Sequence, residues 1–144
     1  MKHNSKWTRT GMVLVFSALI ALGAGILNAF TSVNTPDSKW MAPASANGKK
    51  NPVATSAASI EAGKKIYSKE CASCHGKKGF GDGPKASDLS KEPHNLSTKE
   101  FQSQSDGAIF WKITKGNKPM PTFATAYTDE ERWNVVNYLR TLGK

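Results

Sequence analysis

The two cysteines of this 144-residue chain lie three positions apart in the segment CASCH, and a histidine directly follows the second. Cys71, Cys74 and His75 therefore place two thiols and an imidazole within about one helical turn. Side chains of these types can bind a metal ion, exchange electrons as a dithiol, form a disulfide or hold a cofactor. Each use makes a different demand on the rest of the sequence.

Three of these uses find little support elsewhere in the chain. A structural zinc site needs four ligands, usually from two paired sets, and His3 and His94 are the only other histidines. A redox dithiol of the thioredoxin kind needs a preceding strand in a βαβ frame, and no strand pattern precedes Cys71. A disulfide between Cys71 and Cys74 would close a very small loop and add little stability.

Covalent haem attachment accounts for all three residues. C-x-x-C-H is the attachment signature of c-type haem: each thiol adds to one vinyl group of a porphyrin, and the histidine that follows binds the iron. We therefore expect one haem c, attached through Cys71 and Cys74, with His75 as an axial iron ligand. Attachment of this kind takes place outside the cytoplasm of bacteria.

Met120 is the expected second axial ligand. Pro119 and Pro121 flank it and exclude a helix there, so its side chain extends from a loop. The chain between His75 and Met120 is long enough to pass around the edge of a porphyrin. The alternative for Met120 is a core-filling role, and His94 is expected to be a solvated loop residue.

Three helices are expected to position these residues. Steps of three and four put one set of residues on a single helical face before CASCH: Ile60, Gly63, Tyr67 and Cys71. Ser105–Lys115 forms a short amphipathic pattern that Gly116 ends. A capping box of Thr128 and Glu131 opens a last helix that we expect to stop at Gly143. No segment carries a strand pattern, so the fold class is all-α.

The N-terminal part differs in composition from the rest. Residues 1–30 combine early basic residues with an uncharged run from Gly11 to Phe30, which would rise about 30 Å as a helix, enough to span a bilayer. We expect a membrane anchor with a cytoplasmic N-terminus; a cleaved signal peptide is the alternative. Residues 31–56 are expected to be a flexible linker, and residues 57–144 the folded domain.

The positive charge is spread over both parts of the chain. The formal net charge is +9; six basic residues against one acidic residue give +5 in residues 1–56, and fourteen against ten give +4 in residues 57–144. A nucleic-acid surface would cluster basic residues on the folded domain, so nucleic acid is not an expected partner. The excess fits an ordinary solvated face or a weak preference for an acidic partner.

Residues 57–143 resemble class I cytochrome c of the small bacterial kind. The segments that carry the resemblance are CASCH, GFGDGP, SDGAIFWKITKG, MPTF and TDEERWNVVNYLRTL. The resemblance implies three to five helices around one haem c, with Gly63 allowing the first helix to approach the last at Val135 and Tyr138. It also implies that the carbonyl of Pro84 accepts a hydrogen bond from the ligand histidine.

Two details of the resemblance stay open. The stretch between Gly116 and Met120 is shorter than the family often has, which leaves the geometry of this loop undetermined. Trp111 either packs on the haem or bonds one of its propionates, or else belongs to the core.

With His75 and Met120 both bound, the iron would have no open position. We therefore expect an electron-transfer protein rather than an enzyme, with a reduction potential raised by the sulfur ligand. The expected role is a monomeric carrier between a quinol-oxidising complex and a terminal oxidase or reductase. Its haem domain would lie on the periplasmic side of the cytoplasmic membrane, or be soluble in the periplasm after signal cleavage.

Two alternatives to this role remain. One is a haem subunit of a larger oxidase, reductase or dehydrogenase complex. The other is a haem sensor or peroxidase whose methionine ligand dissociates. In the carrier role, exposed lysines such as Lys77, Lys78 and Lys118 would steer docking to acidic partners.

Overall fold

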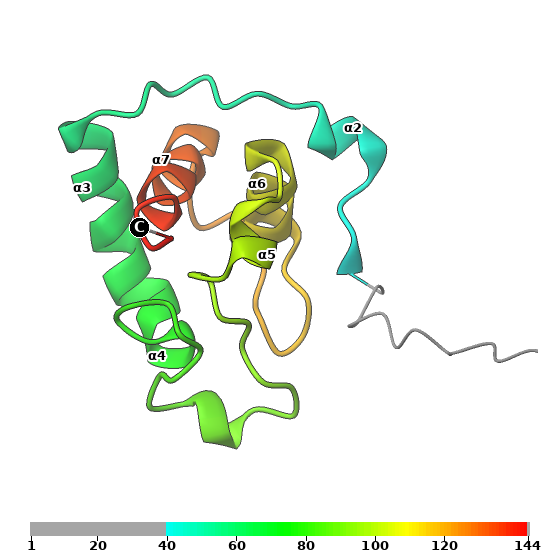
Figure 1. Cartoon of the computed structure of the whole chain (residues 1–144), viewed down its shortest axis with the longest axis vertical. Helices are drawn as coiled ribbons and strands as arrows, with labels where there is room; N and C mark the ends of the chain where they lie inside the picture. Colours follow the sequence, from blue (N-terminus) through cyan, green and yellow to red (C-terminus); the bar gives the residue numbers. More distant parts are fainter. Residues whose placement is uncertain (1–39, 144) are drawn as a thin grey trace, which may run out of the picture. The chain divides into compact units, whose positions relative to one another are not determined.

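Helices form the regular structure of residues 40–143, the part of the chain that the computed structural model describes (Figure 1). In chain order they are α2 (Ala44–Asn47), α3 (Ala57–Ile66), the π-helix η2 (Tyr67–Cys71), α4 (Ala72–His75), the 3₁₀ helix η3 (Ala86–Asp88), α5 (Lys99–Gln102), α6 (Asp106–Lys115) and α7 (Asp129–Leu139). The β-type pairing within these residues is a single bridge between Asn117 and Met120. The predicted all-α class is confirmed.

The predicted anchor or signal segment, residues 1–30, lies outside the described residues, as does the first part of the predicted linker. Between Trp40 and Gly143, no helix combines the length and the apolar character needed to cross a bilayer.

The helix that leads to CASCH begins at a reciprocal cap. The side chain of Ser56 accepts from the backbone N–H of Ser59, and the side chain of Ser59 accepts from the backbone N–H of Ser56. From α3 the chain stays helical through η2 and α4. The predicted helix therefore continues into the C-x-x-C-H segment and places both thiols on helical backbone.

Helices α3 and α7 cross at very close range. A Cβ atom added to Gly63 would lie 2.0 Å from the carbonyl oxygen of Asn134 and 2.9 Å from the backbone nitrogen of Val135. One turn along, the rings of Tyr67 and Tyr138 lie 5.1 Å apart. The expected approach of the first and last helices at Gly63 is confirmed, because only the missing side chain makes room for it.

Helix α7 begins where the sequence predicted and ends earlier. The capping box is present: Thr128 accepts from the N–H of Glu131, and the Glu131 carboxylate accepts from the N–H of Thr128 at 2.8 Å. The helix ends at Leu139 instead of Gly143. The N–H of Thr141 turns back to the carbonyl of Tyr138 at 2.8 Å, which tightens the last turn and ends the α-helical pattern.

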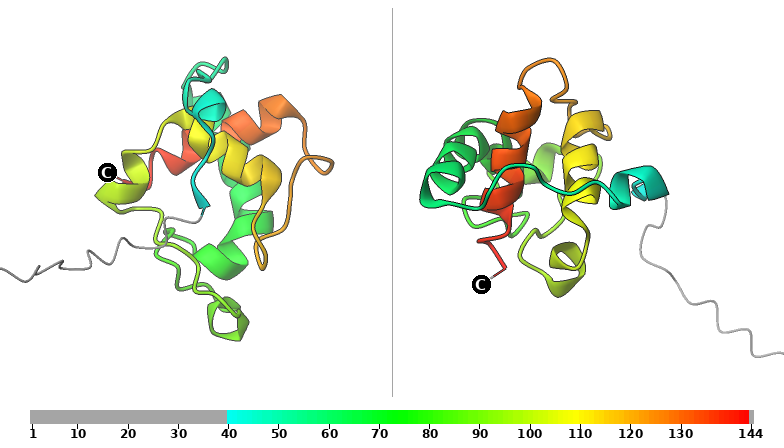
Figure 2. Two further views of the ribbon diagram at one scale, coloured as in Figure 1. Left: turned by 90° about the vertical axis from the view of Figure 1, so that its right-hand side faces the viewer. Right: turned by 90° about the horizontal axis from the view of Figure 1, so that it is seen from above.

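Residues 40–56, which we call the strap, pack on the folded domain. They run from α2, beside α6, across α7 to the start of α3 (Figures 1 and 2). Ala42 and Ala46 are buried against Ala108 of α6, and Asn51 donates to the buried side chain of Asn137 at 2.9 Å. The expectation of a flexible linker up to residue 56 is therefore wrong for these residues, because small apolar and amide side chains give them specific contacts.

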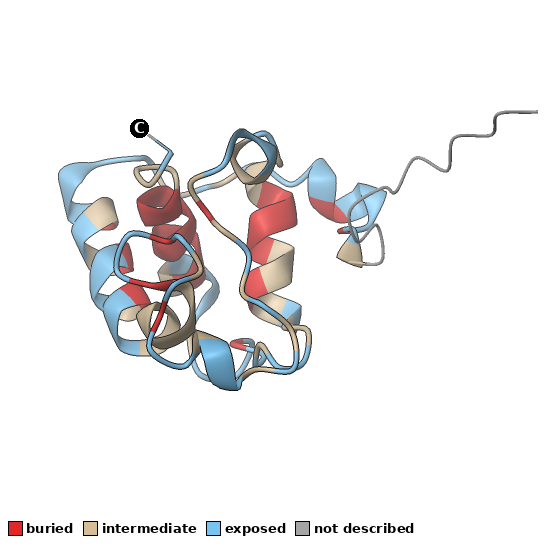
Figure 3. Cartoon of the chain, turned by 60° about the horizontal axis from the view of Figure 1, so that its bottom comes forward, coloured by how far each residue is buried: buried red, intermediate tan, exposed pale blue. Residues whose placement is uncertain are grey.

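The core lies between α3, α6 and α7 (Figure 3). Its most deeply buried side chains are Tyr67, Ile109, Trp133 and Val136. The rings of Phe110 and Trp133 stack with their centroids 4.0 Å apart, which joins α6 to α7. Met120 and Cys71 are only partly buried at the edge of this core, so the core supports one side of the site described next.

Candidate haem-binding site

A partly open cavity lies beside α4. Four segments line it, and two of them carry the predicted ligands. The lining residues are Trp40, Glu70, Cys71, Cys74, His75, Leu89, Lys91, Glu92, Pro93, His94, Asn117, Pro119, Met120, Pro121 and Phe123. The structure thus brings together Cys71, Cys74, His75 and Met120, as the sequence predicted.

Both cysteines are free thiols on one wall of this cavity. Cys71 closes the π-helical turn and Cys74 lies in α4, about one turn further. Burial raises the pKa of the Cys71 thiol to about 12, with the neighbouring Glu70 and Cys74 adding to the effect. Cys71 is therefore protonated near neutral pH, and neither cysteine is held in a disulfide, so both sulfurs are available for attachment.

The His75 imidazole has the protonation pattern of a metal ligand. Its Nδ1 lies 3.1 Å from the carbonyl oxygen of His94, and because a carbonyl can only accept, Nδ1 donates. Burial lowers the pKa of His75, so the ring is neutral near pH 7 and Nε2 keeps its lone pair. An imidazole with one nitrogen fixed by a carbonyl and the other free is the usual arrangement of an iron-binding histidine.

The carbonyl that fixes His75 is not that of Pro84, which corrects the expectation from the resemblance. The residues around Pro84 are held at the end of α4, where Gly83 donates to the carbonyl of Cys74 at 3.0 Å and Lys85 donates to that of Ser73 at 2.8 Å. Pro84 is exposed and does not line the cavity. The carbonyl of His94 accepts the hydrogen bond from the imidazole instead. His94 itself is exposed, as predicted.

A tight glycine turn fixes the backbone directly after His75. Gly76 has φ of 80°, a conformation that favours glycine, and its carbonyl accepts from the buried hydroxyl of Tyr67 at 2.6 Å. Gly81 donates to the carbonyl of His75 at 2.8 Å. The glycines of GFGDGP thus serve a turn beside the cavity, as the sequence indicated.

The short stretch before Met120 forms a compact turn. The backbone groups of Asn117 and Met120 exchange two hydrogen bonds, of 3.0 and 2.9 Å. Gly116 has φ of 66°, and a Cβ there would lie 2.4 Å from the carbonyl oxygen of Pro121. The three residues between Gly116 and Met120 are therefore sufficient, because the chain doubles back on Gly116 and presents Met120 to the cavity.

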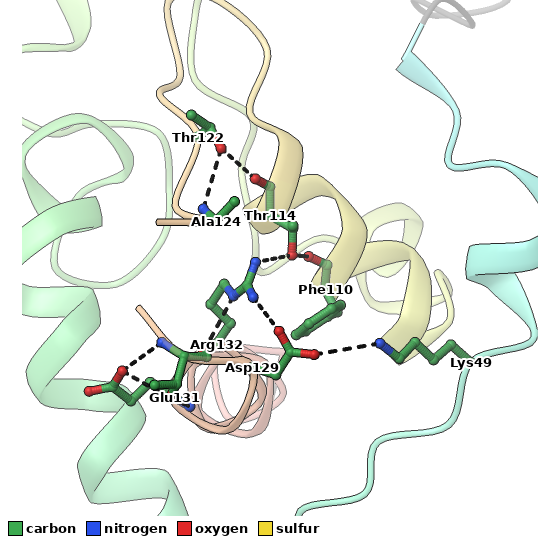
Figure 4. A network of polar contacts seen from close by, with 9 residues as sticks. Lys49, Phe110, Thr114, Thr122, Ala124, Asp129, Glu131 and Arg132 are labelled. Atoms are coloured by element: carbon green, nitrogen blue, oxygen red, sulfur yellow. Dashed lines mark hydrogen bonds and ion pairs between the residues drawn. The ribbon is translucent and has the colours of Figure 1, made fainter. Parts of the chain in front are cut away.

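Side-chain bonds hold the other end of this loop. Thr122 Oγ1 donates to the carbonyl of Thr114 at 2.6 Å, and the buried Arg132 donates to Thr114 Oγ1 at 2.8 Å (Figure 4). The backbone N–H of Phe123 donates to the carbonyl of Ile113 at 3.3 Å. The loop that carries Met120 is thereby attached to the last turn of α6.

The structure adds residues to the site that the sequence did not indicate. Trp40 of the strap lines the cavity, and so does the irregular segment from Leu89 to His94. No pattern in the sequence marks a backbone carbonyl such as that of His94, because any residue could supply it. Trp111 lies outside the cavity and packs on the alanine cluster between α2 and α6, which matches its alternative role in the core.

The donor set and the cavity fit a covalently attached haem. Two thiols, one imidazole with a free lone pair and one thioether face the same space, and much of its remaining lining is proline, leucine and aromatic side chains. Sulfur and imidazole are axial ligands that haem iron accepts.

Comparison with known proteins points to the same cofactor. Residues 58–139 match the family described as Cytochrome C oxidase, cbb3-type, subunit III. Cytochrome c6 of Thermosynechococcus vestitus is 33% identical over 83 residues, which cover 58% of this chain and 70% of that protein. Cytochrome c6 of Gracilaria tenuistipitata var. liui is 32% identical over 85 residues, with 59% and 74% covered.

Two solved structures are similar in fold as well as sequence. A chain of the Kuenenia stuttgartiensis reducing HAO-like protein complex has a TM-score of 0.60 and 36% identity, covering 65% of this chain. The match spans 47% of that chain, about half its length. The KustC0563 c-type cytochrome has a TM-score of 0.50 and 28% identity, with 57% of this chain and 98% of that one covered.

The family match covers more than half of the chain and includes every predicted ligand. The helical fold and the relatives agree with it, and so we conclude that the chain belongs to the cytochrome c family, as a class I monohaem protein with covalently bound haem c.

Proposed function

We propose that this protein is a one-electron carrier, not an enzyme, and that His75 and Met120 hold its haem iron from opposite sides. The observation that carries the proposal is that Met120 and His75 line the same cavity, although they come from two different segments of the chain. When bound, haem c supplies an iron that changes between the ferrous and ferric states. A saturated iron leaves no position for a substrate.

The protein's own residues favour small rearrangement during electron transfer. The His94 carbonyl fixes the orientation of the His75 ring, and the paired backbone bonds of Asn117 and Met120 fix the sulfur-bearing loop. Phe123, Pro93 and Leu89 give the cavity apolar walls. A ligand set that does not move between redox states, in a cavity of low polarity, suits rapid electron exchange at a raised potential.

Absorption spectroscopy of the oxidised protein tests this ligation. Wild-type protein should show the far-red band of a methionine–iron bond, and Met120→Ala should lose it while keeping the covalent haem. Met41→Ala is the matched control, because Met41 is 70% exposed and does not line the cavity. A far-red band that persists in Met120→Ala would disprove the assignment.

Carbon monoxide binding separates a carrier from a sensor or peroxidase. If Met120 stays bound, the reduced protein should take up carbon monoxide slowly at neutral pH, and Met120→Ala should bind it rapidly. Rapid uptake by the wild type would favour a methionine that dissociates and would argue for the second kind of function.

We further propose that the carrier works on the outer face of the cytoplasmic membrane, between a quinol-oxidising complex and a terminal oxidase or reductase. The apolar run from Gly11 to Phe30 supports a membrane anchor or an export signal. Lys77, Lys78 and Lys118 are exposed and lie in or near the segments that border the cavity, which supports docking to acidic partners. Fractionation of cells that express the full chain tests the location.

A haem subunit of a larger complex is the second candidate. The likeness to a chain of the reducing HAO-like protein complex favours it. Native purification in mild detergent distinguishes the two, because a carrier should be recovered as a single chain. Recovery in stoichiometric association with other subunits would support the second candidate.

A further inference from the structure

The strap, residues 40–56, reaches the cavity although it precedes the segment that matches the cytochrome family, residues 58–139. Trp40 at its beginning lines the cavity, together with Met120 and the two cysteines. It is the one residue before Glu70 among those that line the cavity in the described part of the chain. The strap therefore adds a wall to the site that the matched domain does not itself provide.

Helix α6 has a recess that accommodates the strap. A Cβ on Gly107 would lie 2.0 Å from the carbonyl oxygen of Ala46 and 2.5 Å from that of Lys49. Ala42 and Ala46 are buried next to Ala108. The backbone of the strap thus lies directly on the backbone of α6, and the glycine is what permits it.

Two polar anchors tie the strap to α7. The Lys49 ammonium lies 4.6 Å from the ring centre of Phe110 and 3.9 Å from the carboxylate of Asp129 (Figure 4). Asn137 is 2% exposed, and its side chain accepts from Asn51 at 2.9 Å and donates to the carbonyl of Val53 at 3.3 Å. A buried amide that is satisfied mainly by the strap indicates that the strap belongs to the folded domain.

The Trp40 ring is itself held in place. Lys112 of α6 lies over it, with the ammonium 5.2 Å from the ring centre. The same ammonium donates to Gln104 Oε1 at 2.5 Å, which limits its movement. A large, partly buried aromatic ring in a fixed position can exclude water from the space that it borders.

We propose that the strap is a cover of the haem site, in which Trp40 shields the iron from water and small ligands and so raises the reduction potential. This inference rests on the proposed ligation by His75 and Met120, because it assigns a role to residues around that iron. Removing the ring would admit water, which stabilises the more highly charged ferric state. The potential should then fall.

The test uses two variants that disturb the strap at different places. Trp40→Ala removes the ring. Gly107→Ala substitutes no residue that lines the cavity, but its Cβ pushes the strap away from α6 at Ala46. Alanine is also the better helix former, so α6 itself should persist. Gly48→Ala is the matched control, since a Cβ there meets nothing closer than 4.0 Å, and Trp40→Phe retains an aromatic ring.

We expect both disturbing variants of the full-length holoprotein to show a lower reduction potential and severalfold faster carbon monoxide binding to the ferrous form. Gly48→Ala should match the wild type, and Trp40→Phe should lie close to it. Circular dichroism reports whether the helices persist; if Trp40→Ala does not accumulate, the comparison of Gly107→Ala with Gly48→Ala decides. Wild-type behaviour of either Gly107→Ala or Trp40→Ala would overturn the proposal.

The two proposals fail in different ways. If the wild type lacks the far-red band, the ligation by Met120 is wrong, but the potential still tests the strap, because the haem remains attached beside Trp40. If the wild type shows the band and the strap variants leave both readouts unchanged, the ligation stands and the role of the strap is wrong.

Discussion

At the scale of single residues, the lack of a side chain at Gly63 determines how closely α3 and α7 pack. Gly63 lets α3 touch the backbone of α7 at Asn134 and Val135. It therefore sets the point along α7 at which the helix that leads to Cys71 crosses it. Tyr67 and Tyr138 then meet next to this contact. A pattern search for apolar faces detects the helices, but the position of the crossing depends on one glycine.

Gly63→Ala should destabilise the protein strongly. The added Cβ would lie 2.0 Å from a backbone carbonyl oxygen, which no rotamer change can relieve, so the helices must separate along part of the core. Overpacking typically costs about 1–3 kcal/mol, and more where backbone must move. Urea unfolding followed by circular dichroism measures the loss, with Gly48→Ala as a control of the same chemistry in open space. Equal stabilities of the two variants would contradict the close crossing.

At the scale of elements, two caps fix the limits of the helices that frame the core. Thr128 was readable as a helix start because a hydroxyl followed three residues later by a glutamate is a local signal, whereas the cap of Ser56 and Ser59 emerged only from the structure. The carboxylate of Glu131 accepts from both the N–H of Thr128, at 2.8 Å, and its hydroxyl, at 3.0 Å. These bonds lower the pKa of Glu131.

The lowered pKa of Glu131 implies a stability contribution that acid removes. A carboxyl group with a lower pKa in the folded than in the unfolded state stabilises the fold above its unfolded pKa. The contribution is lost as the pH falls through the folded pKa. Glu131→Gln should therefore be less stable than the wild type at about pH 7, and the difference should shrink toward about pH 3.

Urea unfolding across this pH range measures the difference for Glu131→Gln. Glu130→Gln is the matched control, because it removes the same charge from the same helical turn and leaves the capping box intact. A deficit of Glu131→Gln that stays constant with pH, or that Glu130→Gln shares in full, would contradict the assignment to the cap.

A second element, the loop that carries Met120, depends on a bond outside the metal site. Thr122 Oγ1 donates to the carbonyl of Thr114 at 2.6 Å, and Arg132 reaches the hydroxyl of the same Thr114 from α7. The loop is thus joined to both α6 and α7 (Figure 4). We infer that this connection keeps the sulfur in place when the iron changes its charge.

Thr122→Val should loosen the loop without altering any cavity residue. The variant loses the bond to Thr114 and the one that Thr122 Oγ1 accepts from the backbone N–H of Ala124 at 3.3 Å, which should cost about 1–2 kcal/mol of stability. Met120 should dissociate more often, so carbon monoxide should bind the ferrous protein faster. Stopped-flow measurements compare it with Thr122→Ser, which keeps the hydroxyl. If the valine and serine variants bind carbon monoxide at the same rate, the bonds of the Thr122 hydroxyl do not position Met120.

At the scale of the whole molecule, the sequence predicted the three longest helical segments and four side chains that meet in one cavity, but not the full enclosure of the site. Cys71, Cys74, His75 and Met120 were identifiable because covalent attachment and proline-flanked loops restrict residue types. The carbonyl of His94 and the ring of Trp40 were not, since a carbonyl has no residue signature and Trp40 lies in a polar segment without periodicity. The strap was mistaken for a linker because its anchors, such as Asn137, lie far away in the chain.

The net charge of the molecule leads to a prediction about encounter rates. The +9 charge should accelerate the reaction of the reduced protein with an anionic oxidant such as ferricyanide, and added salt should slow it, because exposed charges are screened beyond about 10 Å at 0.1 M ionic strength. A cationic cobalt complex should show the opposite dependence. Lys118 lies in the turn between Asn117 and Met120, both of which line the cavity, so its charge acts close to the haem.

Lys118→Gln should therefore reduce the salt dependence of the ferricyanide reaction more than Lys64→Gln, although both variants lose one unit of charge. Lys64 lies on α3, is exposed and does not line the cavity. Stopped-flow rates at several salt concentrations give the slopes for the wild type and both variants. Equal slopes for the variants would mean that total charge governs the encounter; a larger effect of Lys118→Gln would show that electrons leave through the cavity edge beside Met120.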